Sequence, residues 1–170
     1  MSHWQCLLVG LLVLGGSGCA GYKLGPVNGV AAREKSVQVI PFENKTLEPN
    51  LSDAVTSQLR LQLQRDGTYQ LASHNDGDIV VSGSVTLYQR VEVSFSSSDI
   101  LTVRDYRLEL RAQVTARDRG NGKLILDQPV TGSTLIRVTT DLTSAERQAL
   151  PLLAADLAKN VTALLTEGGW

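Results

Sequence analysis

Two long stretches of alternating polar and apolar residues constrain the fold of this chain more than any other feature of its sequence. The first begins at Ile79 and ends near Val93, and the second covers residues 101–117, after a serine-rich turn. A period of two is typical of a strand with one buried and one solvated face. The residues expected to face a core are Ile79, Val81, Gly83, Val85 and Leu87, followed by Tyr106, Leu108, Leu110, Ala112, Val114 and Ala116.

The positions between them are polar and are expected to face outward. They are Ser82, Ser84, Thr86, Tyr88 and Arg90 in the first stretch, and Arg107, Glu109, Arg111, Gln113, Thr115 and Arg117 in the second. A strand from Ile79 to Val93 would span roughly 50 Å at about 3.3 Å per residue, so we expect the serine-rich tip to project beyond a small core. In an unbroken strand Leu101 would face the opposite side from Tyr106 and the apolar residues after it. This change of side predicts a bulge near Arg104-Asp105.

Shorter patterns supply the remaining elements. Further strands are expected at residues 36–42, 68–73 and 124–138, the last with edge character at Pro129. Residues 43–50 predict a loop, and leucines at helical spacing predict one helix from Leu51 and another near the C-terminus. This order predicts an α+β fold. We expect a two-layer sandwich in which two helices pack on one face of a mixed, mostly antiparallel sheet of four to five strands.

The helix ends carry recognisable signals. Asn50 is expected to be the N-cap of the first helix, and Gly67 occupies the position after its last turn, where a left-handed conformation is common. Thr143–Glu146 matches a capping box that would open the second helix. Pro151 lies inside that pattern, so it either kinks the helix or marks its true first turn.

The N-terminal segment indicates export and lipidation. An apolar run, Leu7–Leu14, is closed by small residues, and Cys19 follows them directly. A short apolar run of this kind is typical of a secretory signal, and a cysteine at the next position is typical of bacterial lipoproteins, in which the thiol carries a diacylglycerol. We therefore expect a lipoprotein signal peptide over residues 1–18, lipidation at Cys19, a lipidated tether over residues 19–35 and a single α+β domain over residues 36–170. Glycines interrupt the apolar run, which argues against a transmembrane helix.

Composition argues against catalysis, cofactors and nucleic acid. The net charge is −1, whereas general nucleic-acid binding needs a basic field. Once a leader is removed and Cys19 is acylated, no free thiol remains, and His74 is the one histidine left. A catalytic triad, a cysteine–histidine pair or a histidine-rich metal site cannot be assembled from these residues. The sequence predicts an anchored binding or assembly subunit with no cofactor and no metal site, and not an enzyme.

The outward arginines are the candidate binding residues. Alternate residues of a strand share a face, so guanidinium groups in these rows could meet phosphates or carboxylates. From strand geometry we take Arg90, Arg107 and Arg111 as candidate contacts to an anionic ligand. The alternative is a solvated face whose charges serve solubility.

Several short motifs resemble the LptE family of lipopolysaccharide-assembly lipoproteins. They are Cys19–Gly25, Val37–Thr46, Glu48-Pro49, Leu51–Leu63 followed by Asp66-Gly67-Thr68-Tyr69, and Gly83 within the first long strand. The resemblance extends through the paired long strands and the leucine-rich final helix. It implies an outer-membrane lipoprotein that faces the periplasm and sits as a plug and assembly subunit inside an LptD-type β-barrel.

The same resemblance implies lipopolysaccharide as a ligand, bound by basic residues, and insertion of that lipid into the outer leaflet. Ala20, in place of the aspartate that often retains lipoproteins at the inner membrane, agrees with outer-membrane sorting. Val37–Thr46 with Asp78–Gly83 also resembles curli-secretion-type lipoproteins of the CsgG kind. That alternative implies a homo-oligomeric secretion complex.

Overall fold

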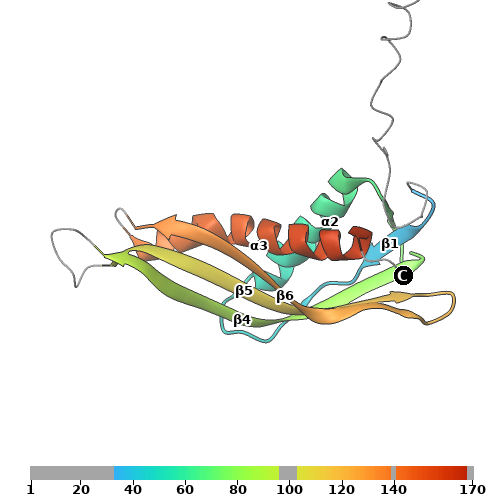
Figure 1. Ribbon diagram of the computed structural model, residues 1–170, viewed down its shortest axis with the longest axis horizontal. Coiled ribbons are helices and arrows are strands. Elements are labelled where there is room, and N and C mark those ends of the chain that lie inside the picture. Colours follow the sequence, from blue (N-terminus) through green and yellow to red (C-terminus); the bar gives the residue numbers. More distant parts are fainter. Residues whose placement is uncertain (1–32, 96–102, 139–140, 168–170) are drawn as a thin grey trace, which may run out of the picture.

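The computed structural model describes residues 33–95, 103–138 and 141–167 (Figure 1). In chain order its elements are β1 (Ser36–Val39), β2 (Glu43–Asn44), α2 (Leu51–Asp66), β3 (Gln70–Leu71), β4 (Ile79–Phe95), β5 (Val103–Asp118), β6 (Leu124–Arg137) and α3 (Leu142–Glu167). The order agrees with the one predicted, except for β2. This two-residue strand lies where a loop was expected, because its backbone pairs with Ser84 and Val85 of β4.

The strands form one mixed sheet. Its order is β3-β1-β4-β5-β6, and β2 also pairs with β4. β1 runs parallel to both β3 and β4, whereas β4, β5 and β6 are antiparallel neighbours. Parallel neighbours need a long crossover, which α2 supplies between β1 and β3, while the antiparallel strands follow one another directly along the chain. The predicted α+β fold with a mixed sheet is confirmed.

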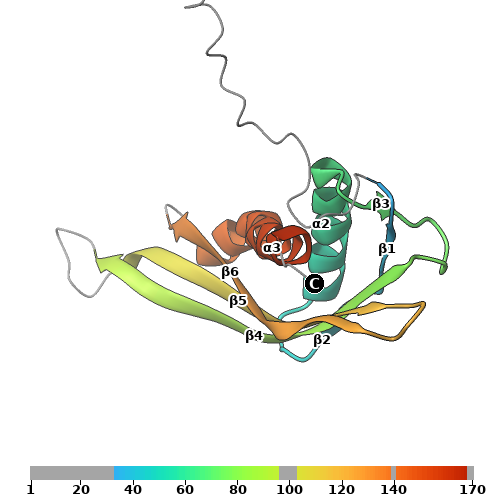
Figure 2. The ribbon, with the colours of Figure 1, turned by 45° about the vertical axis from the view of Figure 1, so that its right-hand side comes forward.

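Both helices lie on the same face of the curved sheet, and no described element covers the opposite face (Figures 1 and 2). The core lies between the two layers, and the side chains that are almost fully buried there include Phe42, Leu51, Leu59, Leu63, Leu108, Leu110, Leu153, Leu157 and Leu165. Burying one such side chain contributes about 2 kcal/mol. The β4–β5 hairpin extends past α3 at one end (Figure 1). The serine-rich tip expected there lies outside the described residues.

The register of the long strands departs from strict alternation at two places. Val85 of β4 pairs with Ala112 of β5, and Leu87 pairs with the adjacent Arg111. Thr86 is therefore an extra residue in β4 without a partner in this pairing. A second irregularity lies between Glu92 and Phe95, where the pairing passes over Arg104. The bulge predicted near Arg104-Asp105 is therefore confirmed, and the one at Thr86 was not predicted.

The Thr86 bulge moves the following residues to the other face of the sheet. Tyr88 pairs with buried Leu110 and packs against the core, and Leu87 pairs with exposed Arg111. The prediction that Leu87 faces the core while Tyr88 and Arg90 face outward was wrong.

The helix ends agree with the sequence signals only in part. Gly67 takes the expected left-handed conformation, with φ 74°, and its N–H donates to the Leu63 carbonyl. Asn50 precedes α2 as expected, but its side chain makes no capping hydrogen bond. α3 is capped by Asp141, whose carboxylate accepts the Ser144 N–H at 2.8 Å, so the predicted capping box at Thr143 was wrong. α3 continues through Pro151, which excludes that proline as its first turn.

Candidate functional site

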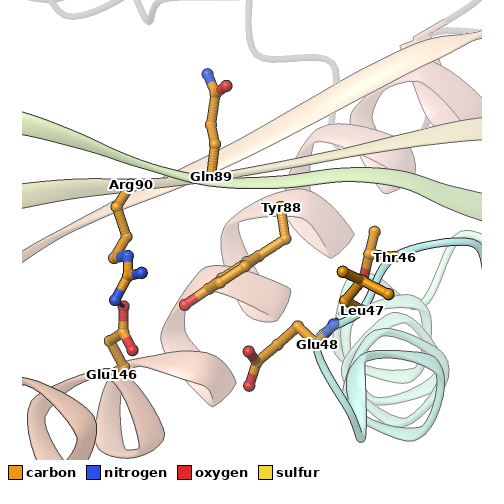
Figure 3. A pocket seen from close by; sticks show the side chains of 7 residues that line it. All are labelled: Thr46, Leu47, Glu48, Tyr88, Gln89, Arg90 and Glu146. Carbon is orange, nitrogen blue, oxygen red and sulfur yellow. Dashed lines mark hydrogen bonds and ion pairs between the residues drawn. The ribbon is translucent and has the colours of Figure 1, made fainter.

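A groove opens between β4, the loop before α2 and the first turns of α3 (Figure 3). Its volume is about 510 Å³, and its lining residues are Thr46, Leu47, Glu48, Tyr88, Gln89, Arg90 and Glu146. The Thr86 bulge creates it by turning Tyr88 and Arg90 toward the helices. The groove therefore combines three segments that are far apart in the sequence.

An ion pair closes one side of the groove. Nη1 of Arg90 lies 3.1 Å from Oε1 of Glu146, so the pair ties β4 to α3. The Glu146 side chain is 17% exposed and the Arg90 side chain 49% exposed. Arg90 carries five N–H donors in a planar fork. An anionic ligand could therefore reach this guanidinium from solvent while its other edge stays against Glu146.

Tyr88 lies in the same groove with its hydroxyl buried. Within the part of the chain that the structure describes, Oη has no hydrogen-bond partner. Burial, together with the negative charges of Glu146 and Glu48, raises the pKa of Tyr88 to about 12. The phenol is therefore protonated at neutral pH and can donate its O–H. Figure 3 shows the ring directed into the groove, whereas Gln89 points to the opposite side of the strand.

The opposite face of the sheet holds the other two candidate arginines. Arg107 and Arg111 are both exposed on β5, and neither forms an ion pair with any described residue. They are four residues apart, which is about 13 Å along a strand. Between them, Glu109 accepts a hydrogen bond from Gln89 at 2.8 Å. This geometry leaves two unpaired guanidinium groups on a surface that a ligand with more than one anionic group could span.

The structure thus separates the three arginines that sequence geometry placed together. Arg107 and Arg111 share the open face, and Arg90 lies on the helix side with Glu146. Tyr88 and Glu146 were missed as site residues because their proximity depends on the bulge and on where α3 docks. Cys19 and the predicted leader lie outside the described residues.

Two further properties bear on chemistry and membrane contact. In the described segments, no group of three or more His, Cys, Asp or Glu side chains is placed to hold a metal ion. By length and composition α3 could cross a membrane, yet half of its apolar window is buried inside the domain. Such burial is what a core helix of a folded domain shows.

An open mixed sheet with two helices on one face defines a class of small α+β domains that solved structures also contain. A hypothetical protein from Chlamydia trachomatis is 11% identical, with a TM-score of 0.58 over 79% of this chain and 96% of its own. A protein from Xanthomonas campestris is 10% identical, with a TM-score of 0.55 over 85% of this chain and 92% of its own. A minor lipoprotein from Acinetobacter baumannii is 19% identical, with a TM-score of 0.50 over 78% of this chain and 92% of its own. At these identities the likeness establishes the fold.

Residues 34–165 match the family model described as LptE, lipopolysaccharide-assembly, so the chain belongs to the LptE family. The family resemblance seen in the sequence is confirmed. Membership makes the chain a bacterial envelope lipoprotein of a non-enzymatic family that works with the lipopolysaccharide-transport machinery. No curated protein matches. The comparisons give no support to the curli-secretion-type alternative.

Proposed function

We propose that this protein is an outer-membrane lipoprotein, anchored through Cys19, that acts as plug and assembly subunit of an LptD-type β-barrel. In this role it faces the periplasm, assists barrel assembly and insertion of lipopolysaccharide into the outer leaflet, and catalyses no reaction. The observation that carries the proposal is the open face of the sheet in a member of the LptE family.

The chemistry of that face favours a wet, polar socket. Along β5 its outward residues are Arg107, Glu109, Arg111, Gln113, Thr115 and Arg117. Burying unpaired guanidinium groups against an apolar surface would cost several kcal/mol each. The lumen of a membrane β-barrel is polar and can hydrate or hydrogen-bond such groups. A lipid anchor also confines the search for the barrel to one membrane surface, which raises the effective concentration.

Purification of the native chain in mild detergent tests the plug proposal. We expect one large barrel protein at equal stoichiometry, and mass spectrometry is expected to find residue 19 as an acylated N-terminal cysteine. A homo-oligomeric ring without a barrel would contradict the plug role, and an intact leader or an unmodified thiol would contradict the anchor.

Lipopolysaccharide is the ligand that we propose for the arginines. Its phosphates are multiply charged and accept paired N–H bonds from guanidinium groups. On the open face, Arg107 and Arg111 are available without breaking an ion pair, whereas at Arg90 the phosphate must compete with Glu146. The open face is therefore expected to dominate binding.

Charge reversal separates the two surfaces. The double variant Arg107→Glu with Arg111→Glu is expected to weaken lipopolysaccharide binding at least tenfold without changing the unfolding temperature. Arg117→Glu reverses one charge at the far end of the same strand face, so it is the matched control for each single variant, Arg107→Glu or Arg111→Glu, and is expected to have little effect. Arg90→Glu is expected to weaken binding less than the double variant. Binding by the double variant equal to that of the control would remove Arg107 and Arg111 from the proposal.

A further inference from the structure

β6 is an edge strand of the sheet, and side chains of α3 cover the middle of its free edge. The Ser133 N–H donates to Oδ2 of Asp156 at 2.8 Å, and Nδ2 of Asn160 donates to the Thr131 carbonyl at 2.8 Å. The backbone groups of residues 131 and 133 therefore point away from β5. Two helix side chains, one turn apart, occupy the places where another strand would pair.

The hairpin end of β6 is protected differently. Ile125 is an extra residue at the register shift opposite Ala116 and Arg117, and Pro129 lacks the N–H that a pairing strand would need. Bulges and prolines are two of the features that keep edge strands from pairing with other chains. From Leu124 to Ser133 the edge is therefore guarded.

Protection stops at Leu135. N–H and C=O groups alternate in direction along an antiparallel strand, so those of residues 135 and 137 point outward like those of Ser133. One helical turn before Asp156 stands Leu152, which cannot hydrogen-bond. Leu135 and Leu152 are each 64% exposed. Arg137 directs its guanidinium to Asp105 on β5, with Nε 2.8 Å from Oδ1, and not over the edge.

We propose that the edge of β6 at Leu135–Arg137 pairs with an extended segment of the barrel partner. Strand addition uses the unpaired backbone groups for affinity and alternate side chains for specificity. Leu135 lies on the open face of the sheet and Leu152 on the helix face. The segment therefore carries two neighbouring apolar residues, one packing on each leucine. The barrel as the source of this segment rests on the proposed function.

The length of the unguarded edge favours a short partner segment over a second copy of this chain. Two-fold pairing of β6 with another β6 would need the edge on both sides of Leu135. Asp156 already occupies that edge at Ser133. A segment that pairs only with residues 135 and 137 does not need the place at Ser133 that Asp156 occupies.

The test compares the free chain with its purified barrel complex by amide hydrogen exchange. We expect the amides of Leu135 and Arg137 to exchange at least 100-fold more slowly in the complex. Leu152→Asp puts a carboxylate one turn before Asp156, where it can accept the Leu135 N–H, and is expected to weaken barrel binding at least tenfold. Leu61→Asp adds the same charge at an exposed leucine of α2 and is the matched control.

Leu135→Pro provides a second variant, because it removes an outward N–H at a position of the same parity as Pro129, and the same loss of binding is expected. The pairing edge is overturned if the complex forms normally, the amide of residue 135 stays unprotected in it, and Leu152→Asp binds the barrel as tightly as wild type does. That outcome leaves the plug proposal intact. A crosslink from residue 135 to a second copy also overturns it. Absence of a barrel from the wild-type preparation overturns both proposals.

Discussion

Gly132 is a position where a single added methyl group should strongly disturb the packing of a helix on the sheet. It lies on β6 directly under α3, and a Cβ there would be 2.5 Å from the backbone N of Leu157 and 2.8 Å from its Cα. Backbone atoms cannot rotate away as the end of a side chain can. Because the interior is close-packed, α3 must move outward by roughly 1 Å to accept the methyl group.

The cost of Gly132→Ala follows from two opposing effects. Overpacking a well-filled core costs about 1–3 kcal/mol, and the contact with backbone places this site toward the upper end. Loss of glycine freedom in the unfolded chain returns about 0.4–1 kcal/mol. We expect a net loss of about 2 kcal/mol in the free energy of unfolding, which lowers the unfolding temperature by about 6 °C for a domain of this size.

Urea denaturation followed by far-ultraviolet circular dichroism measures this loss. Gly120→Ala is the control, because its nearest neighbour is the Asp118 carboxylate at 3.3 Å, and its change should stay within about 0.5 kcal/mol. Truncating Leu157 to alanine should not rescue Gly132→Ala, since two of the three nearest atoms are backbone. A Gly132→Ala domain as stable as wild type, or rescue by Leu157→Ala, would refute the proposed clash.

Three further results are expected. Thr56 and Thr162 are both buried, but Oγ1 of Thr56 accepts the Phe42 N–H at 3.0 Å, whereas Thr162 Oγ1 has no partner among the described residues. Urea titration should therefore show Thr56→Val losing about 1–3 kcal/mol and Thr162→Val neutral or more stable, and equal changes would contradict this. Absorbance titration should place the pKa of Tyr88 at about 12. Because that pKa is raised, the contribution of Tyr88 to stability is present below about pH 10 and is lost as the pH rises toward 12. The variant Tyr88→Phe should abolish this decline in stability. The hydrogen bond from Lys35 lowers the pKa of Asp118 below 3.8, so its contribution is present above pH 3.8 and lost as pH falls through the lowered pKa. Asp118→Asn should flatten that acid decline in thermal melts, and an unchanged slope would count against the pair.

Local and periodic signals predicted most of the fold. The alternation of polar and apolar residues predicted β4 and β5, although both contain irregularities, and Gly67 marked the end of α2 because few other residues take its φ of 74°. β2 was missed because its two residues become a strand only through pairing with β4, which no local pattern reveals. The cap of α3 was misplaced because Thr143–Glu146 fits a capping box, while Asp141 lies two residues earlier and accepts the first free N–H groups instead.

The candidate site was less accessible to sequence reasoning. Arg107 and Arg111 lie within β5, whose pairing with β6 is regular through both positions, so their shared face was predictable. Arg90 follows the bulge at Thr86, which has neither the glycine nor the proline that would have signalled it. Its partner Glu146 lies in a helix whose docking on the sheet depends on contacts far apart in the chain.

The bulge at Thr86 decides how the charges are distributed between the two faces. With strict alternation, Arg90 would have joined Arg107 and Arg111 on the open face, and Leu87 would have faced the helices. The extra residue instead sets Arg90 against Glu146 and leaves Leu87 beside Arg111. Under the proposed function, an anion on the open face would meet Arg107 and Arg111, with the carboxylate of Glu109 between them. An anion in the groove would instead compete directly with Glu146 for Arg90. One inserted residue thereby places the candidate arginines on two surfaces with different partners, and the proposal predicts that an anion binds them with different affinities.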